Sequence, residues 1–148
     1  MREILFRGKK KNGDWAYGFV DFGGGSFFIN EVFETPPTWS DPCGDTHYER
    51  HLVDHETIGQ YTGLEDKSGV KIFECDVVEG VVKLQSNEDP ESVMNIHVYG
   101  VVKWSDDGLR FYVSGIDNMC SLDFVCDSYI LEVIGNIYEN PELMDGEK

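Results

Sequence analysis

Alternating hydrophobic and polar positions predict an opening β-hairpin. Residues 4–7 and residues 15–19 each alternate in this way, and the dipeptide Asn12-Gly13 lies between them. An Asn-Gly pair between two alternating runs is a strong hairpin signal. Three consecutive glycines at 23–25 then close the second strand, and we expect a third strand from residue 26 to residue 29.

The same pattern continues along most of the chain. Further strands are predicted at residues 70–73, 76–84, 95–104, 110–113 and 130–138, with a Ser-Asp-Asp-Gly turn at 105–108. Short strands with turns every 8 to 12 residues are typical of a small barrel. The fold class predicted from this pattern is mainly β.

Three segments depart from the strand pattern. Residues 117–127 have apolar positions at helical spacing and Asp117 or Asn118 as a cap, which predicts one short helix. A second brief turn is expected at residues 54–58. Residues 34–46 contain three of the five prolines and form a predicted loop, with Trp39 in its middle either buried or presented to a partner.

Composition and length favour one domain. The chain has 148 residues, 41% of them hydrophobic, which is enough for a packed core. We expect a single domain with a hairpin region at 1–33, the loop at 34–46, and a barrel with its closing strand at 47–140. No stretch approaches the roughly 20 apolar residues of a membrane helix, and no signal peptide precedes the first strand. A cytoplasmic protein with no membrane partner is therefore predicted.

The formal net charge of −16 is unevenly distributed. Residues 1–11 hold five basic residues against Glu3, a net charge of +4, so the remainder carries −20. Direct binding to nucleic acid is not expected of such an acidic body. Lys9, Lys10 and Lys11 either dock on an acidic surface or phosphate, or flank a turn and protect an edge strand from aggregation.

The cysteines and histidines give one candidate metal pattern. Cys43, His47, His51 and His55 are spaced by four residues and would share one face of a helix, but Pro42 and the lack of an apolar stripe oppose that helix. In a strand, His47, Glu49 and His51 would share a face instead. We expect no bound metal or cofactor, with His47, His51 and His55 as the weak candidates, and free thiols at the four cysteines, which form no CxxC pair.

Enzyme signatures are missing from the sequence. It contains no nucleophile elbow, Walker loop or HExxH motif, and the triple glycine precedes neither Lys-Ser nor Lys-Thr. The chain is therefore predicted not to be an enzyme. A metal-assisted hydrolase at the three histidines is the weakest alternative.

One long segment resembles a known family signature. Residues 57–78 read TIGQYTGLEDKSGVKIFECDVV, which is similar to the QYTGLxDKxGxxIxEGDxV signature of the YopX family, small proteins encoded by bacteriophages and prophages. The opening segment, the strand at 100–104 and the ending at 131–143 are similar as well. One position departs from the signature, because Cys75 stands where the family usually has glycine.

The resemblance implies a mainly β protein with an SH3-like barrel and phage or prophage ancestry. The biochemical function of the family is unknown, so the resemblance supplies no catalytic residues to carry over. Structural roles are expected for the signature positions. Turns are expected at Gly59, Gly63 and Gly69, hydrogen bonds to backbone amides at Asp66, and core packing at Tyr61 and Leu64. Asp76 also belongs to the signature. If the family glycine has a positive φ, Cys75 must adopt that angle at a cost or follow a different path.

Two functions remain open. The first is a non-enzymatic binding module that assembles with itself or with a phage or host protein, through contacts that include Trp39 and the three lysines. The second is an acidic decoy whose carboxylates imitate a phosphate backbone for a host DNA-binding protein.

Overall fold

The computed structural model describes residues 3–40, 42–85, 89, 91–115, 119–121 and 129–145, with the backbone alone described at 35, 82–85, 119–121 and 129. Most of these residues lie in antiparallel strands, so the prediction of a mainly β fold is confirmed. The one helix within these ranges is the 3-10 helix η2 (Pro141–Met144). Over the same residues, the chain forms no helix whose length and apolar character would allow it to cross a membrane.

The chain divides into two compact units, Met1–Tyr61 and Thr62–Lys148. The division falls inside one long strand, β4 (Asp45–Glu65), because its beginning pairs with strands of unit 1 and its end with a strand of unit 2. The single domain expected from length stays a prediction.

Unit 1 is a set of strands that closes on itself. β1 (Phe6–Lys10), β2 (Trp15–Gly23), β3 (Ser26–Thr35) and β4 pair in this order, and β1 also pairs with β4. The predicted opening hairpin is confirmed, and Gly13 has the positive φ of 92° that its tight turn requires. Because β1 is paired on both sides, the interpretation of its lysines as protection of an edge strand is wrong. The buried residues of this unit's core are Ala16, Ile29 and Val53.

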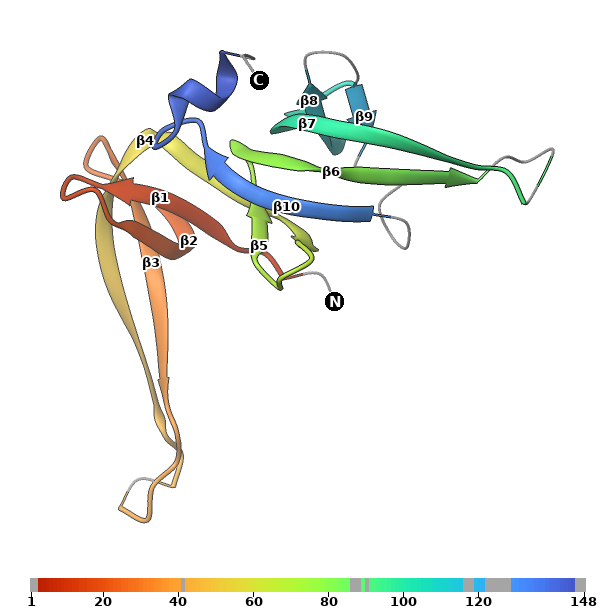
Figure 1. The fold of residues 1–148 in the computed structure, drawn as a ribbon. Coiled ribbons are helices and arrows are strands. Elements are labelled where there is room, and N and C mark those ends of the chain that lie inside the picture. Colours follow the sequence, from red (N-terminus) through yellow and green to blue (C-terminus); the bar gives the residue numbers. More distant parts are fainter. Residues whose placement is uncertain are drawn as a thin grey trace. The chain divides into compact units, whose positions relative to one another are not determined.

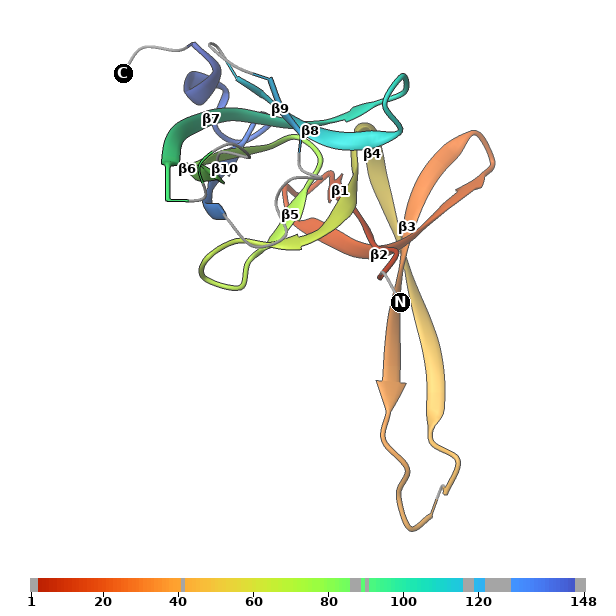
Figure 2. The ribbon, with the colours of Figure 1, turned by 90° about the vertical axis from the view of Figure 1, so that its right-hand side faces the viewer.

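A long two-stranded ribbon extends from this core (Figures 1 and 2). β3 and β4 pair from Phe28 opposite Leu52 to Thr35 opposite Asp45. Residues 30–51 are called the arm below. The predicted loop at 34–46 is two residues too long at each end, because β3 continues through Thr35 and β4 begins at Asp45. Cross-strand hydrogen bonds thus extend the sheet up to the proline-rich turn.

The turn predicted at residues 54–58 is wrong, because these residues belong to β4. They form a bulge there: Lys9 lies opposite Asp54 and Arg7 opposite Gly59, so β4 advances five residues where β1 advances two. The hydroxyl of Thr57 donates to the Asp54 carbonyl oxygen at 2.7 Å. The local turn tendency is therefore expressed as a bulge within a strand.

Unit 2 holds the larger core. β5 pairs with the end of β4, and the other strands form a second sheet in the order β10-β6-β7-β8-β9. The bounds are β5 (Lys71–Phe73), β6 (Asp76–Gln85), β7 (Val93–Ser105), β8 (Arg110–Gly115), β9 (Met119–Ser121) and β10 (Tyr129–Asn136). The core comprises Ile72, Val78, Val98, Val102, Phe111, Val113 and Leu131. The SH3-like barrel stays an expectation.

The helix predicted at 117–127 is wrong where the structure describes it. Met119–Ser121 form β9, whose register with β8 runs from Ser114 opposite Met119 to Tyr112 opposite Ser121. The other positions of that prediction lie outside the described residues. Pairing with an existing strand thus outweighs a helical spacing of only a few apolar residues.

Candidate functional site

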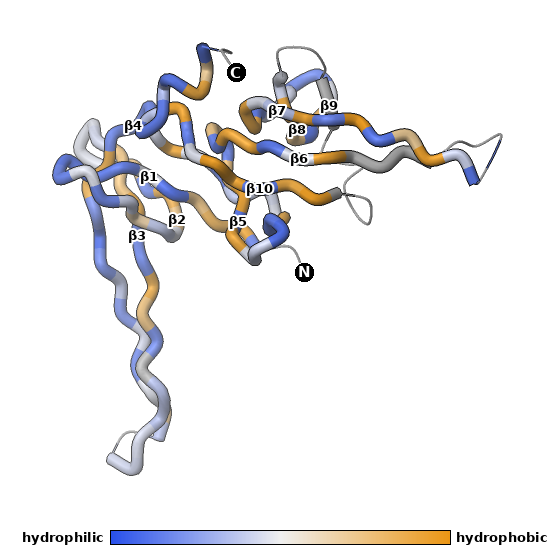
Figure 3. Tube along the Cα trace, in the orientation of Figure 1, coloured by the Kyte–Doolittle hydropathy of each residue, from blue (hydrophilic) through white to orange (hydrophobic). Residues whose placement is uncertain are grey.

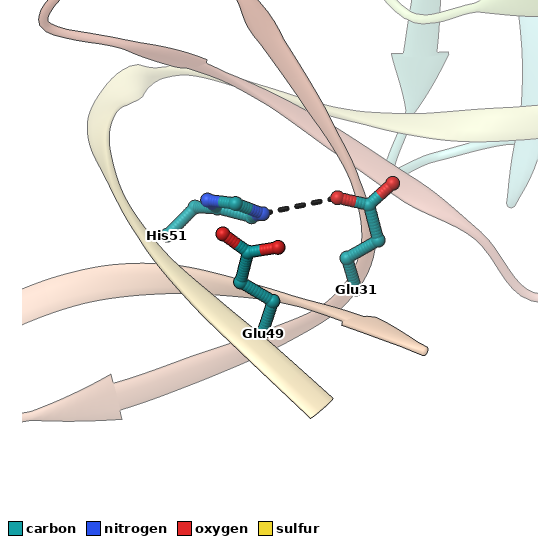
Figure 4. Close-up of side chains that lie close together, drawn as sticks. All are labelled: Glu31, Glu49 and His51. Carbon is teal, nitrogen blue, oxygen red and sulfur yellow. Dashed lines mark hydrogen bonds and ion pairs between the residues drawn. The ribbon is translucent and has the colours of Figure 1, made fainter. Parts of the chain in front are cut away.

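A histidine and two glutamates meet near the base of the arm (Figure 4). The imidazole Nε2 of His51 lies 3.0 Å from a carboxylate oxygen of Glu31. Glu49 completes the cluster, and one ligand atom from each residue lies within 4.8 Å of the other two. One nitrogen and two carboxylate oxygens are a donor set that binds divalent transition ions in proteins.

Strand register explains why these three side chains meet. Glu31 lies directly opposite Glu49. His51 lies opposite Ile29, and this pair is two residues further along both strands, on the same face of the sheet. Directly opposed residues of antiparallel strands have their Cβ atoms about 5 Å apart. Ile29 is fully buried in the core, so the position of His51 is fixed by packing at the base of the arm.

The three histidines considered from the sequence do not come together. The ring of His47 stacks on Phe33 at a centroid distance of 5.5 Å, and that of His55 stacks on Phe27 at 5.9 Å. Cys43 is an exposed free thiol, and Cys75 is also free. Sequence spacing found His51 and placed Glu49 on its face in a strand, but it missed Glu31, because only the β3–β4 register brings that residue to the cluster.

The end of the arm presents an exposed indole. Trp39 is 100% exposed, and it lies in the turn between β3 and β4. Residues Asp45–Arg50 of the returning strand are all exposed as well. Glu34 and Asp45 flank the turn on either strand. The end of the arm is therefore an aromatic and acidic surface.

A second surface of unit 1 has the opposite character. An open hollow of about 710 Å³ lies between the β1–β2 turn, the β2–β3 turn and the β4 bulge. Its lining combines three lysines, one carboxylate and one imidazole with apolar side chains: Lys9, Lys10, Lys11, Asp54, His55, Phe27, Leu52 and Val53. The predicted contact residues Trp39 and the lysines thus lie on two separate surfaces of the same unit. The hollow is basic and apolar in a chain whose formal net charge is −16.

The comparisons with known proteins place the chain in a family. The family model described as YopX protein matches residues 32–145. This chain belongs to the YopX family. The match covers β4 and the whole of the described part of unit 2, but not residues 1–31, so the similarity noted for the opening segment is not part of it. No curated protein matches the chain. Membership of the YopX family makes the chain a phage-related protein.

The YopX signature contains a buried aspartate that orders a turn. Asp66 accepts hydrogen bonds from the backbone N–H groups of Ser68 at 2.7 Å, Val70 at 3.0 Å and Val133 at 3.1 Å. Burial alone would raise the pKa of this carboxyl, but those three hydrogen bonds and the adjacent Lys67 charge together hold the pKa below its usual range. The side chain therefore fixes the β4–β5 turn and ties it to β10.

The other YopX signature residues also have structural surroundings. Gly63 and Gly69 have φ angles of 88° and 82°. Gly59 and Gly63 both lie in β4, Gly59 opposite Arg7, so the turns expected at these two glycines are wrong and only Gly69 lies in a turn. The buried Asp76 carboxylate accepts a hydrogen bond from the Phe73 N–H at 2.8 Å. Tyr61 is buried, and Leu64 packs against the core of unit 2.

Cys75 adopts the backbone conformation that suits a glycine. Its φ is 67°, in the left-handed region. Its N–H donates to the Val102 carbonyl oxygen, and its own carbonyl oxygen accepts from the Ile137 N–H. These two bonds hold the chain on this path, so the departure from the YopX pattern is accommodated as local strain.

Proposed function

We propose that this phage-related protein is a non-enzymatic module that assembles with further copies of itself through the arm. The observation that carries the proposal is the complete exposure of Trp39 at the end of the arm. Tryptophan is among the residues that contribute most to binding when buried in an interface. An exposed indole at the end of a ribbon is therefore well placed to be covered by a partner.

A second copy offers a complementary surface. The arm end brings one aromatic ring and two carboxylates, at Glu34 and Asp45, while the hollow of unit 1 brings lysines and apolar side chains. Its volume lies in the range of pockets that enclose ligands of moderate size. Every copy carries both surfaces, so two copies can satisfy them reciprocally or more copies can join head to tail.

The electrostatic part of this contact is directional. Lys10 and Lys11 make no ion pair within the ranges that the structure describes. Opposite charges on the two surfaces steer association and fix the orientation of the partner. Assembly should accordingly weaken as salt is raised, because screening shortens the range of these charges.

Light scattering over a range of micromolar concentrations tests the proposal. The unmodified protein is expected to exceed the mass of one chain, and Trp39→Ala is expected to raise the dissociation constant at least about tenfold, as for an interface residue at which truncation has a large effect. Met94→Ala is the matched control, since it removes an exposed apolar side chain of unit 2. It should leave the mass unchanged.

A charge exchange separates the docking contact from unspecific association. Lys10→Glu with Lys11→Glu should disrupt assembly, and adding Glu34→Lys with Asp45→Lys should restore it. A protein that stays monomeric at about 100 μM before any substitution would contradict the proposal. So would a quadruple variant as defective as the lysine double variant. The acidic decoy stays an alternative prediction.

A further inference from the structure

We propose that Glu31, Glu49 and His51 form a binding site for one divalent transition ion of the Zn²⁺ class. The site is independent of the proposed self-assembly, since neither Trp39 nor the lysine hollow takes part in it. It also differs from the histidine pattern considered in the sequence, because two of its three ligands are carboxylates from facing strands.

The charge arrangement favours a cation at this place. Glu31 and Glu49 are directly opposed across the two strands, and like charges in that position repel. His51 lies against one of the two carboxylates, and its side chain is only 13% exposed. A metal ion between the three groups would neutralise the carboxylates and use the neutral imidazole as a third ligand.

The distances are close to those of a metal site. Adjacent ligands about 2.0 to 2.1 Å from one ion lie about 2.8 to 3.0 Å from each other in octahedral geometry and about 3.3 to 3.4 Å in tetrahedral geometry. The 3.0 Å between His51 and Glu31 already meets this requirement. Both remaining separations involve Glu49 and lie within 4.8 Å, so this exposed side chain would have to move toward the other two ligands when an ion binds.

The chemistry of the ligands selects the class of ion. An imidazole nitrogen favours Zn²⁺ and its neighbours over Mg²⁺, which prefers oxygen ligands and retains its water. Three protein ligands leave at least one coordination position open to water. Bound at this position, the ion would join β3 to β4 where the arm leaves the core.

Calorimetric titration of ZnCl₂ into untagged, metal-stripped full-length protein tests the site. We expect one high-affinity ion per chain, with Glu49→Gln and His51→Ala each weakening the affinity at least tenfold. His55→Ala is the matched control, because it removes a histidine of the same strand that lies outside the cluster, and it should keep the affinity. An excess of MgCl₂ should not compete.

A second measurement places the ion. In NMR spectra of the histidine rings, added Zn²⁺ should shift the signals of His51, and those of His47 and His55 should stay in place. Glu49→Gln alters an exposed side chain, so it keeps the fold even if His51→Ala does not. Equal affinity in Glu49→Gln and the unmodified protein, no binding below about 100 μM, or shifts confined to His47 or His55 would each overturn the proposal. Light scattering of Glu49→Gln should still report assembly, so failure of the ion site leaves the proposed function standing.

Discussion

The arm of unit 1 and the core of unit 2 use the same antiparallel pairing for opposite purposes. In unit 2, seven buried side chains from five strands form one cluster. In the arm, backbone hydrogen bonds continue while burial stops, and the first six residues of β4 are all exposed. Figure 3 shows the difference as hydrophobic colour along much of β10 and at the beginning of β6 against a largely hydrophilic arm. Backbone pairing is thus the main feature that shapes the arm, while packing stabilises unit 2.

Side-chain contacts add to this pairing, both within the arm and between the arm and the adjacent residues of β2 and β3. The Arg50 guanidinium lies 3.7 Å from the centre of the Phe28 ring and forms an ion pair with Asp21 at 2.8 Å. His47 stacks on Phe33, two residue pairs closer to the turn than the Glu31–Glu49 pair. Each contact of this kind contributes well under about 1 kcal/mol at an exposed position. The arm therefore relies on weak contacts at exposed positions, whereas unit 2 relies on a buried apolar cluster.

The largest expected difference between the two regions is in side-chain truncation. Ile72→Ala in the core of unit 2 should lower the free energy of unfolding by about 3 kcal/mol, because it leaves a cavity at a fully buried position. Tyr48→Ser, at a 66% exposed position of the arm, should change it by less than about 0.5 kcal/mol. Denaturant unfolding followed by circular dichroism measures both. Similar losses in the two variants would break the comparison.

Asp66→Asn should give the next largest effect, a loss of about 2 kcal/mol at pH 7, because the amide is a weaker acceptor for three backbone N–H groups than the carboxylate. The pKa of Asp66 is lowered in the folded state, so its contribution is complete above the ordinary carboxyl pKa of about 4 and is lost as the pH falls through the folded value. Denaturant unfolding at pH 7 and near pH 3 measures this effect. The difference in the free energy of unfolding between the variant and the unmodified protein should be smaller near pH 3 than at pH 7.

A matched aspartate of unit 1 provides the control for this prediction. Asp54 accepts a hydrogen bond from the Glu56 N–H, and its side chain is 61% exposed. Asp54→Asn should cost less than about 1 kcal/mol at pH 7, since water replaces the lost interaction. If the loss of unfolding free energy in Asp66→Asn is the same at pH 7 and pH 3, the charge of the Asp66 carboxylate does not stabilise the turn.

The smallest expected effect is a gain. Cys75→Gly should raise the free energy of unfolding by about 1 kcal/mol, because a left-handed backbone is unstrained only for glycine. Thermal unfolding should show a small rise in Tm. Cys75→Ala keeps the strain and loses the contact between the Tyr138 hydroxyl and Sγ, so it should give no gain. An equal rise in both variants would assign the effect to the thiol instead of the backbone.

Signals from neighbouring residues predicted much of the strand content. They also predicted two turns that depend on particular residue types. The Asn12-Gly13 hairpin and the glycine turn after Asp66 depend on neighbours in sequence, so they could be read from it. The segments 54–58 and 119–121 could not, because their local tendencies toward turn and helix were outweighed by strand partners far along the chain. The candidate ion site was half predictable for the same reason: Glu49 and His51 share a strand face, but Glu31 joins them only through register.

The sequence by itself determined the mainly β class, the YopX relationship and the uneven charge, because alternation, turn residues and composition are properties of neighbouring positions. Tertiary structure decided that β1 is paired on both sides, that the proline-rich segment ends a long arm with Trp39 exposed, and that two glutamates face one another beside His51. These features depend on which strands pair and in which register, and the energy that selects a register comes from burial of Ile29 and Val53 together, not from any one segment.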